Sequence, residues 1–193
     1  MASASRAYPG ETENGDAWTV QWHDGRCRIA VIDGLGHGPS AAAAARLASD
    51  TLAVRPALAP VEALTACHHA LAGSRGAVMA VVQIDAAVRR LQYVGVGNIE
   101  GHLSGSSRVE HLISDRGIVG SALPRLHPHD LELTAGWLLL LHSDGVISRL
   151  NLLQERSRPG LTLQALADAV LAERGRTNDD ATVVVAGTSW HAR

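Results

Sequence analysis

Several residue types that mark common protein classes are scarce in this chain. Its 193 residues include no phenylalanine, 3% aromatic residues and two cysteines, Cys27 and Cys67. So few aromatics argue against a base-stacking surface for nucleic acid, and two cysteines do not make a disulfide framework. We therefore expect a core of alanine, valine, leucine and isoleucine in a protein suited to a reducing compartment.

Strong net charge and long apolar runs are also missing. Lys+Arg 17 against Asp+Glu 19 gives a formal charge of −2, which offers no electrostatic reason to expect nucleic acid or an anionic membrane as a partner. Residues Met1–Gly10 lack the apolar stretch of a secretory signal. The most apolar run, Trp137–Leu141, is far shorter than the ~20 residues that cross a bilayer. We expect a cytoplasmic protein.

What the chain does have is the composition of one ordinary globular domain. Hydrophobic residues make up 46% and charged residues 19% of the sequence, and no repeat or linker divides it. The prediction is a single domain over residues 1–193, which we expect to act as a monomer.

The first half of the chain predicts a hairpin followed by two helices. Apolar and polar residues alternate over Trp18–Trp22 and Cys27–Val31, on either side of the turn dipeptide Asp24-Gly25. Helices are then expected over Pro39–Val54 and Pro60–Leu71, each opened by a proline that the first helical turn tolerates.

The second half returns mainly to an extended pattern. Strands are expected over residues 77–84, 90–97, 108–113, 131–134, 137–142 and 181–186, and one helix over Leu161–Arg174. Gly95 and Gly97 are expected to mark a bulge or a close backbone approach. Because helices are grouped rather than alternating with strands, the order predicts an α+β fold of antiparallel sheets covered by helices.

Four aspartates stand at strand ends beside glycine, asparagine or another aspartate: Asp16, Asp33, Asp144 and Asp179. Turn chemistry explains any one of them taken singly. However, Asp33 and Asp144 each end a strongly apolar strand, so their carboxylates should emerge at the rim of a buried sheet. Carboxylates brought together raise one another's pKa values unless a cation neutralises them, and oxygen ligands select Mg²⁺ or Mn²⁺ over zinc. Two such ions could hold a phosphate ester and activate water as the nucleophile.

Three motifs surround these acids: Asp33–Gly38, Ser143–Val146 and Asp179–Val183. In order and spacing they resemble the signatures of metal-dependent serine/threonine phosphatases of the type 2C superfamily. The Gly-His-Gly ending of the first motif and the Asp-Asp-x-Thr form of the last resemble the bacterial SpoIIE branch, and the short chain is similar to the RsbX stressosome phosphatases. The resemblance extends from about Asp16 to Val185.

This resemblance implies an αββα sandwich, in which two antiparallel sheets are flanked by helix pairs, with two Mn²⁺ or Mg²⁺ ions. Asp33 matches the carboxylate that bridges both ions, and the carbonyl of Gly34 matches a further ligand. Asp144 and Asp179 match ligands of the second ion, and Asp16 matches the acid that helps to hold the cluster. Asp33 and Asp144 are thus the expected catalytic centre.

The chain departs from its eukaryotic relatives at two places. Glu11 stands where they carry a phosphate-binding arginine, and Leu35 where they carry a histidine. The histidine here is His37, which is either a general acid or a residue that bonds the glycine turn. Asp180 remains an alternative to Asp179 as a ligand, because the two are adjacent.

The function implied by the resemblance is dephosphorylation of phosphoserine or phosphothreonine in signalling proteins, with STAS-domain stressosome or anti-anti-sigma regulators as the partner substrates. A catalytically weak docking module is the alternative. A cysteine phosphatase is excluded because Arg75 follows Cys67 at the wrong spacing. A zinc site among His127, His129, Asp130, His102, His111 and His142 is less favoured, because no complete ligand set is evident.

Overall fold

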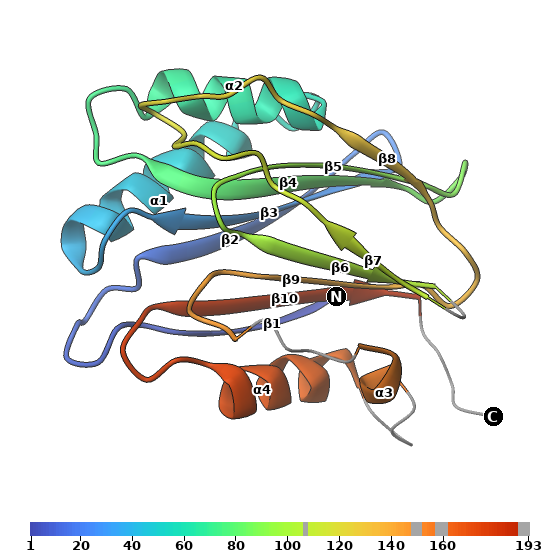
Figure 1. Cartoon of the computed structure of the whole chain (residues 1–193). Helices are drawn as coiled ribbons and strands as arrows, with labels where there is room; N and C mark the ends of the chain where they lie inside the picture. Colours follow the sequence, from blue (N-terminus) through green and yellow to red (C-terminus); the bar gives the residue numbers. More distant parts are fainter. Residues whose placement is uncertain (106–107, 148–151, 157–161, 189–193) are drawn as a thin grey trace.

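Two five-stranded antiparallel sheets lie face to face in the computed structural model, with helices on both outer surfaces (Figure 1). The structure describes residues 1–105, 108–147, 152–156 and 162–188. This is the αββα sandwich expected from the sequence, in the α+β class.

The first sheet is built around the predicted hairpin, with strand order β2-β3-β4-β5-β8. Its strands are β2 (Asp16–His23), β3 (Arg26–Gly34), β4 (Ala77–Asp85), β5 (Arg90–Val96) and β8 (His129–Glu132). Asp24 and Gly25 both have positive φ, 47° and 74°, as a two-residue type I′ turn requires. The β8 strand begins two residues before the predicted segment.

The second sheet has the order β1-β10-β9-β6-β7. Its strands are β1 (Ala2–Arg6), β10 (Ala181–Gly187), β9 (Leu138–His142), β6 (Glu100–Ser104) and β7 (Val109–Leu112). Neither β1 nor β6 was predicted, because their sequences lack regular apolar alternation. The close approach predicted at Gly97 is confirmed: its φ is 96°, and a Cβ there would lie 2.1 Å from Val78 Cγ1.

Helices α1 (Pro39–Ala53) and α2 (Pro60–Ala70) cover the first sheet, whereas α3 (Leu152–Arg156) and α4 (Leu163–Arg174) lie on the second (Figure 1). The predicted prolines do open α1 and α2. The α4 helix begins two residues after the predicted Leu161, which lies outside the described residues, and α3 was not predicted. Thr162 caps α4 by accepting a hydrogen bond from the Ala165 amide at 3.1 Å.

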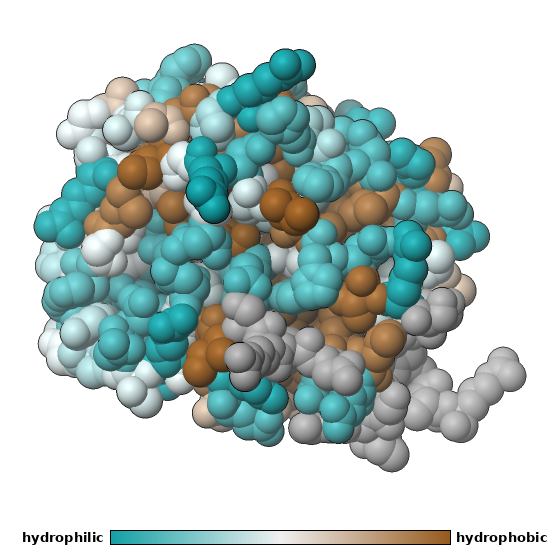
Figure 2. Space-filling view, in the orientation of Figure 1, coloured by the Kyte–Doolittle hydropathy of each residue, from teal (hydrophilic) through white to brown (hydrophobic). Residues whose placement is uncertain are grey.

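Apolar side chains form three layers, one between the sheets and one beneath each pair of helices. Examples are Val31 and Leu141 between the sheets, Ile32 and Leu64 beneath α1 and α2, and Leu140 and Leu166 beneath α4. As the absence of phenylalanine requires, these layers are mainly aliphatic. On the face shown in Figure 2, hydrophobic residues are interspersed with hydrophilic ones.

One buried cation ties the helical layer to the first sheet. The side chain of Arg28 on β3 is 2% exposed and donates hydrogen bonds to the carbonyl oxygens of Leu52 at 2.8 Å and Leu58 at 3.1 Å. These acceptors lie at the end of α1 and in the connection to α2, so Arg28 fixes the helical hairpin against the sheet. No helix among the described residues is long and apolar enough to span a membrane.

Candidate metal centre

Asp16 and Asp33 occupy facing positions in the first sheet. Asp16 begins β2, Asp33 lies near the end of β3, and the two are direct partners in the antiparallel register. Side chains of directly opposed residues are close neighbours on one face, where like charges destabilise the pair. The fold therefore brings two acids together at one end of this strand pair.

The second sheet supplies the other carboxylates. Asp144 follows β9, and Asp179 and Asp180 immediately precede β10. Because β9 and β10 are antiparallel neighbours with His142 opposite Val183, the end of β9 lies beside the start of β10. The Ser143 amide donates to the Thr182 carbonyl at 3.1 Å and continues this pairing toward the acids.

The carboxylates of this cluster affect one another's ionisation. Burial, followed by the charges of four neighbours, raises the pKa of Asp33 to about 9. Those neighbours are Asp16, Asp144, Asp179 and Asp180. Burial is also the main cause that raises the pKa of Asp16 to about 7. Acids from distant parts of the chain thus influence the ionisation of Asp33 in the folded protein.

Two carboxylate oxygens in this cluster are buried without a hydrogen-bond donor among the described residues: Asp16 Oδ1 and Asp180 Oδ2. A buried, unpartnered carboxylate oxygen is costly unless it meets a cation. The donor set is entirely oxygen, which suits Mg²⁺ or Mn²⁺. The residues present therefore fit the expected kind of ion.

Glycines allow the acidic loops to pack closely. A Cβ on Gly34 would lie 2.1 Å from the Ala41 carbonyl oxygen, and one on Gly15 would lie 2.6 Å from Asp180 Oδ2. The Gly34 amide also donates to the Gly15 carbonyl at 3.0 Å, which joins the loops that flank Asp16 and Asp33.

The adjacent acids before β10 have different surroundings. Asp180 is 3% exposed, and its Oδ1 accepts a hydrogen bond from the Tyr8 amide at 2.9 Å. Asp179 is less buried; burial and then the charge of Asp144 raise its pKa, while Arg176 opposes that rise. The charges of both residues affect Asp33. Asp180 is also fixed by a hydrogen bond from the main chain.

The family model for Stage II sporulation protein E (SpoIIE) matches residues 23–189. The chain belongs to the SpoIIE family. This membership and the fold place it among the type 2C phosphoprotein phosphatases, which are hydrolases.

Solved structures share this fold. One, described under the bacterial stressosome as a modular system adapted to control secondary messenger signaling, is 32% identical with a TM-score of 0.90, covering 95% of this chain and 96% of that one. RsbX in complex with magnesium is 20% identical with a TM-score of 0.86, covering 97% and 94%. The Mycobacterium tuberculosis serine/threonine phosphatase PstP/Ppp is 20% identical with a TM-score of 0.73, covering 98% of each chain. Curated protein sequences gave no match.

In this SpoIIE-family protein, His37 is held by residues outside the carboxylate cluster. Its Nδ1 lies 2.9 Å from Glu11 Oε1, and its ring stacks on Tyr8 with centroids 4.2 Å apart. Glu11 thus orients the histidine. With Nδ1 engaged, any proton donation by His37 falls to Nε2.

Two further polar residues contact the predicted acids but had no role assigned from the sequence. Asn98 Nδ2 donates to Asp144 Oδ2 at 2.6 Å, and Ser143 Oγ donates to Asp16 Oδ2 at 2.6 Å. Ser143 stands inside a recognised motif, and Asn98 follows the Gly95-Val96-Gly97 segment. The adjacent motif and glycine segment drew attention to these two positions in the sequence. Only the folded chain shows that Asp16 and Asp144 are their hydrogen-bond partners.

Proposed function

We propose that this SpoIIE-family protein is a Mn²⁺- or Mg²⁺-dependent phosphatase that removes phosphate from serine and threonine side chains of regulatory proteins. The carrying observation is the convergence of carboxylates from both sheets, with the pKa of Asp33 raised to about 9. Such a cluster is stable in its ionised form only with cations among its oxygens.

The proposed ligands divide between the two sheets. Asp33 would lie between two ions, with the Gly34 carbonyl beside it, and Asp144 and Asp179 would hold the second ion. Asp16 would complete the cluster. When bound, the ions supply charge that polarises a phosphate ester and activates water for direct attack on phosphorus.

Several side chains of the protein prepare this site. Ser143 holds Asp16 in one orientation through a 2.6 Å hydrogen bond, and Asn98 does the same for Asp144. Both donors stabilise ionised carboxylates. We assign His37 the donation of a proton from Nε2 to the leaving seryl oxygen, with Glu11 fixing the ring through Nδ1.

The proposed substrates are phosphorylated STAS-domain proteins of the stressosome or anti-anti-sigma type. The similarity to RsbX and to a structure described under the bacterial stressosome supports this choice. The protein would act on these partners as a single-domain monomer, residues 1–193, in the cytoplasm.

The deciding experiment is phosphate release from a purified STAS-domain phosphoprotein with and without Mn²⁺. We expect metal-dependent release by the wild type and none by Asp33→Asn or Asp144→Asn. Asp168→Asn is the matched control, because Asp168 is exposed on α4 and bonds only Gln164 among the described contacts. A folded wild type that binds Mn²⁺ but releases no phosphate would instead identify a docking module.

A further inference from the structure

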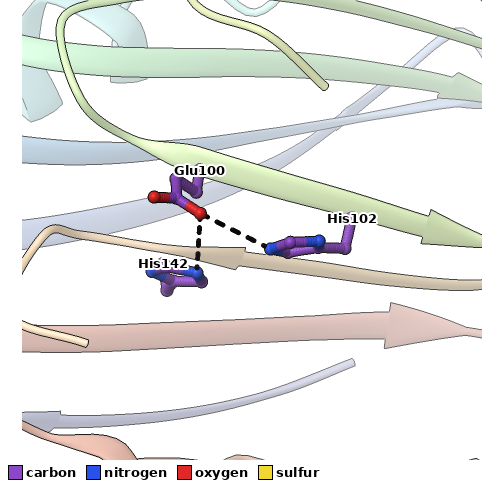
Figure 3. Close-up of side chains that lie close together, drawn as sticks. All are labelled: Glu100, His102 and His142. Carbon is purple, nitrogen blue, oxygen red and sulfur yellow. Dashed lines mark ion pairs between the residues drawn. The ribbon is translucent and has the colours of Figure 1, made fainter. Parts of the chain in front are cut away.

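A second group of metal-ligating side chains lies on two neighbouring strands of the second sheet (Figure 3). Glu100 and His102 are two residues apart on β6, so they project from the same face of the strand. His142 on β9 is the direct register partner of Glu100. Three side chains from neighbouring strands thus meet at one place: Glu100, His102 and His142.

The spacing of these side chains leaves room for an ion. The Nε2 atoms of His102 and His142 each lie 3.8 Å from Glu100 Oε2, which is too long for a hydrogen bond. All three ligand atoms lie within 4.8 Å of one another. Ligands around a tetrahedral zinc ion, with bonds of ~2.1 Å, stand about 3.4 Å apart. Side-chain adjustments of an ångström or less would therefore bring the three atoms to coordinating distance.

The hydrogen bonding of His142 prepares its other nitrogen as a ligand. Its Nδ1 lies 2.8 Å from the Ser143 carbonyl oxygen, so Nδ1 carries the proton and donates it. In the neutral ring this leaves a lone pair on Nε2, the atom that faces Glu100. An Nδ1–H bonded to a carbonyl is the usual orienting partner of a metal-binding histidine.

His102 is harder to explain as a purely structural residue. It is 2% exposed, and neither ring nitrogen has a hydrogen-bond partner among the described residues. Burial is the main cause that lowers the pKa of His102 to about 4, so the ring is neutral near pH 7. Its neighbours offer ring contacts, with His111 edge-on at 4.8 Å between centroids and His142 stacked at 5.7 Å. A buried imidazole without partners calls for a bound water or ion.

We propose that Glu100, His102 and His142 bind one zinc ion through ligands that are distinct from the aspartates. Two imidazoles and a carboxylate form a donor set that favours zinc over Mg²⁺. A cavity of about 260 Å³ borders two of the three ligands, Glu100 and His102, together with His111. The proposal concerns binding alone and does not depend on the phosphatase activity.

The test is zinc binding to the full chain, measured by competition with a fluorescent zinc chelator in excess Mg²⁺, which occupies the oxygen site. We expect one equivalent of zinc on the wild type and on Asp33→Asn. His102→Gln should weaken binding by more than the ~10–100-fold that loss of an outer-shell partner costs. His69→Gln, a change at an exposed histidine on α2, should leave the affinity unchanged.

A second variant and a spectroscopic measurement distinguish loss of a zinc ligand from loss of the fold. Glu100→Gln alters a partly exposed side chain and should also weaken zinc binding, while Mg²⁺ binding at the aspartates is retained. Co²⁺ in place of zinc should give visible ligand-field bands in the wild type that both variants lose. Absence of zinc binding, loss of the zinc in Asp33→Asn, or unchanged affinity in folded His102→Gln and Glu100→Gln would each overturn the proposal.

Discussion

Ser143 and Asp16 join the two sheets at the acidic site. The Ser143 hydroxyl, which follows a strand of the second sheet, donates a 2.6 Å hydrogen bond to the carboxylate that begins β2 in the first. The Ser143 Oγ also accepts a hydrogen bond from the Thr182 amide at 3.0 Å. One small side chain therefore fixes both the orientation of a buried acid and the relation between the sheets.

Ser143→Ala should weaken metal binding near neutral pH. Without the donated hydrogen bond, the pKa of Asp16, already raised to about 7, rises further, so the metal must displace a more firmly held proton. We expect Mg²⁺ affinity to fall about tenfold at pH 7, and less at pH 9, in calorimetric titrations. Ser49→Ala, which removes only a bond to the Ala45 carbonyl within α1, serves as the control. Equal losses at both pH values would contradict this explanation.

Asp33→Asn should abolish metal-dependent turnover and yet stabilise the metal-free protein. The folded-state pKa of about 9 lies far above the usual value, so ionisation of Asp33 opposes folding. Below the unfolded pKa this cost is absent, and it grows as pH rises toward 9. In urea titrations at pH 8 we expect the variant to exceed the wild type by at least about 1 kcal/mol, or about 2–4 °C in Tm. A difference that shrinks between pH 5 and 9 would refute this account.

Metal binding should release protons in numbers that depend on pH. The raised pKa values of Asp16, about 7, and Asp33, about 9, mean that both acids hold protons at pH 6.5 and mainly Asp33 does at pH 8. Calorimetry in buffers of different ionisation enthalpy should thus give nearly two protons displaced at the lower pH and about one at the higher. Asp16→Asn should reduce the first number to about one. Heats that do not depend on the buffer would show that the acids are ionised before the metal arrives.

Gly34→Ala should destabilise the fold by about 2–3 kcal/mol, because the new Cβ would overlap backbone rather than a movable side chain. That Cβ would lie 2.1 Å from the Ala41 carbonyl oxygen. The control is Gly10→Ala, where φ is 89° but nothing lies within 4 Å, so only about 1 kcal/mol of backbone strain is expected. Denaturant unfolding of the metal-free proteins separates the two costs, and equal costs would rule out the steric explanation.

His37→Gln should slow hydrolysis of phosphoserine much more than hydrolysis of an aryl phosphate. A seryl oxygen needs a proton as it leaves, whereas a nitrophenolate leaves without one, so a general acid matters for the first substrate only. We expect kcat to fall about 100-fold on phosphoserine protein and to change little on p-nitrophenyl phosphate. Equal effects on both substrates would assign His37 a structural role with Tyr8 and Glu11.

The sequence predicted best those features that one strand carries alone. Asp33 and Asp144 could be placed at a sheet rim because each follows a run of buried apolar residues, and the hairpin at Asp24-Gly25 follows from local turn chemistry. Family motifs then supplied the sandwich and the order of the acids. These features depend on neighbouring residues in the sequence, so they can be predicted without the tertiary structure.

What the sequence did not predict depends on pairing between distant segments. The β1 strand, Ala2–Arg6, consists mainly of small residues and is an edge strand defined by its pairing with β10. Ser143 and Asn98 acquire their roles from partners 127 and 46 residues away. The cluster of Glu100 with two histidines was missed for the same reason, since β6 itself was not predicted and His142 reaches Glu100 only through the sheet register.

The division of the carboxylates between the sheets has a consequence for the geometry of the acidic site. Asp16 and Asp33 belong to the first sheet, and Asp144, Asp179 and Asp180 flank strands of the second. A small rotation of one half against the other changes the distances between these two groups together. The affinity for metal is therefore expected to depend on how the two sheets pack together, and not only on the loops that carry the acids.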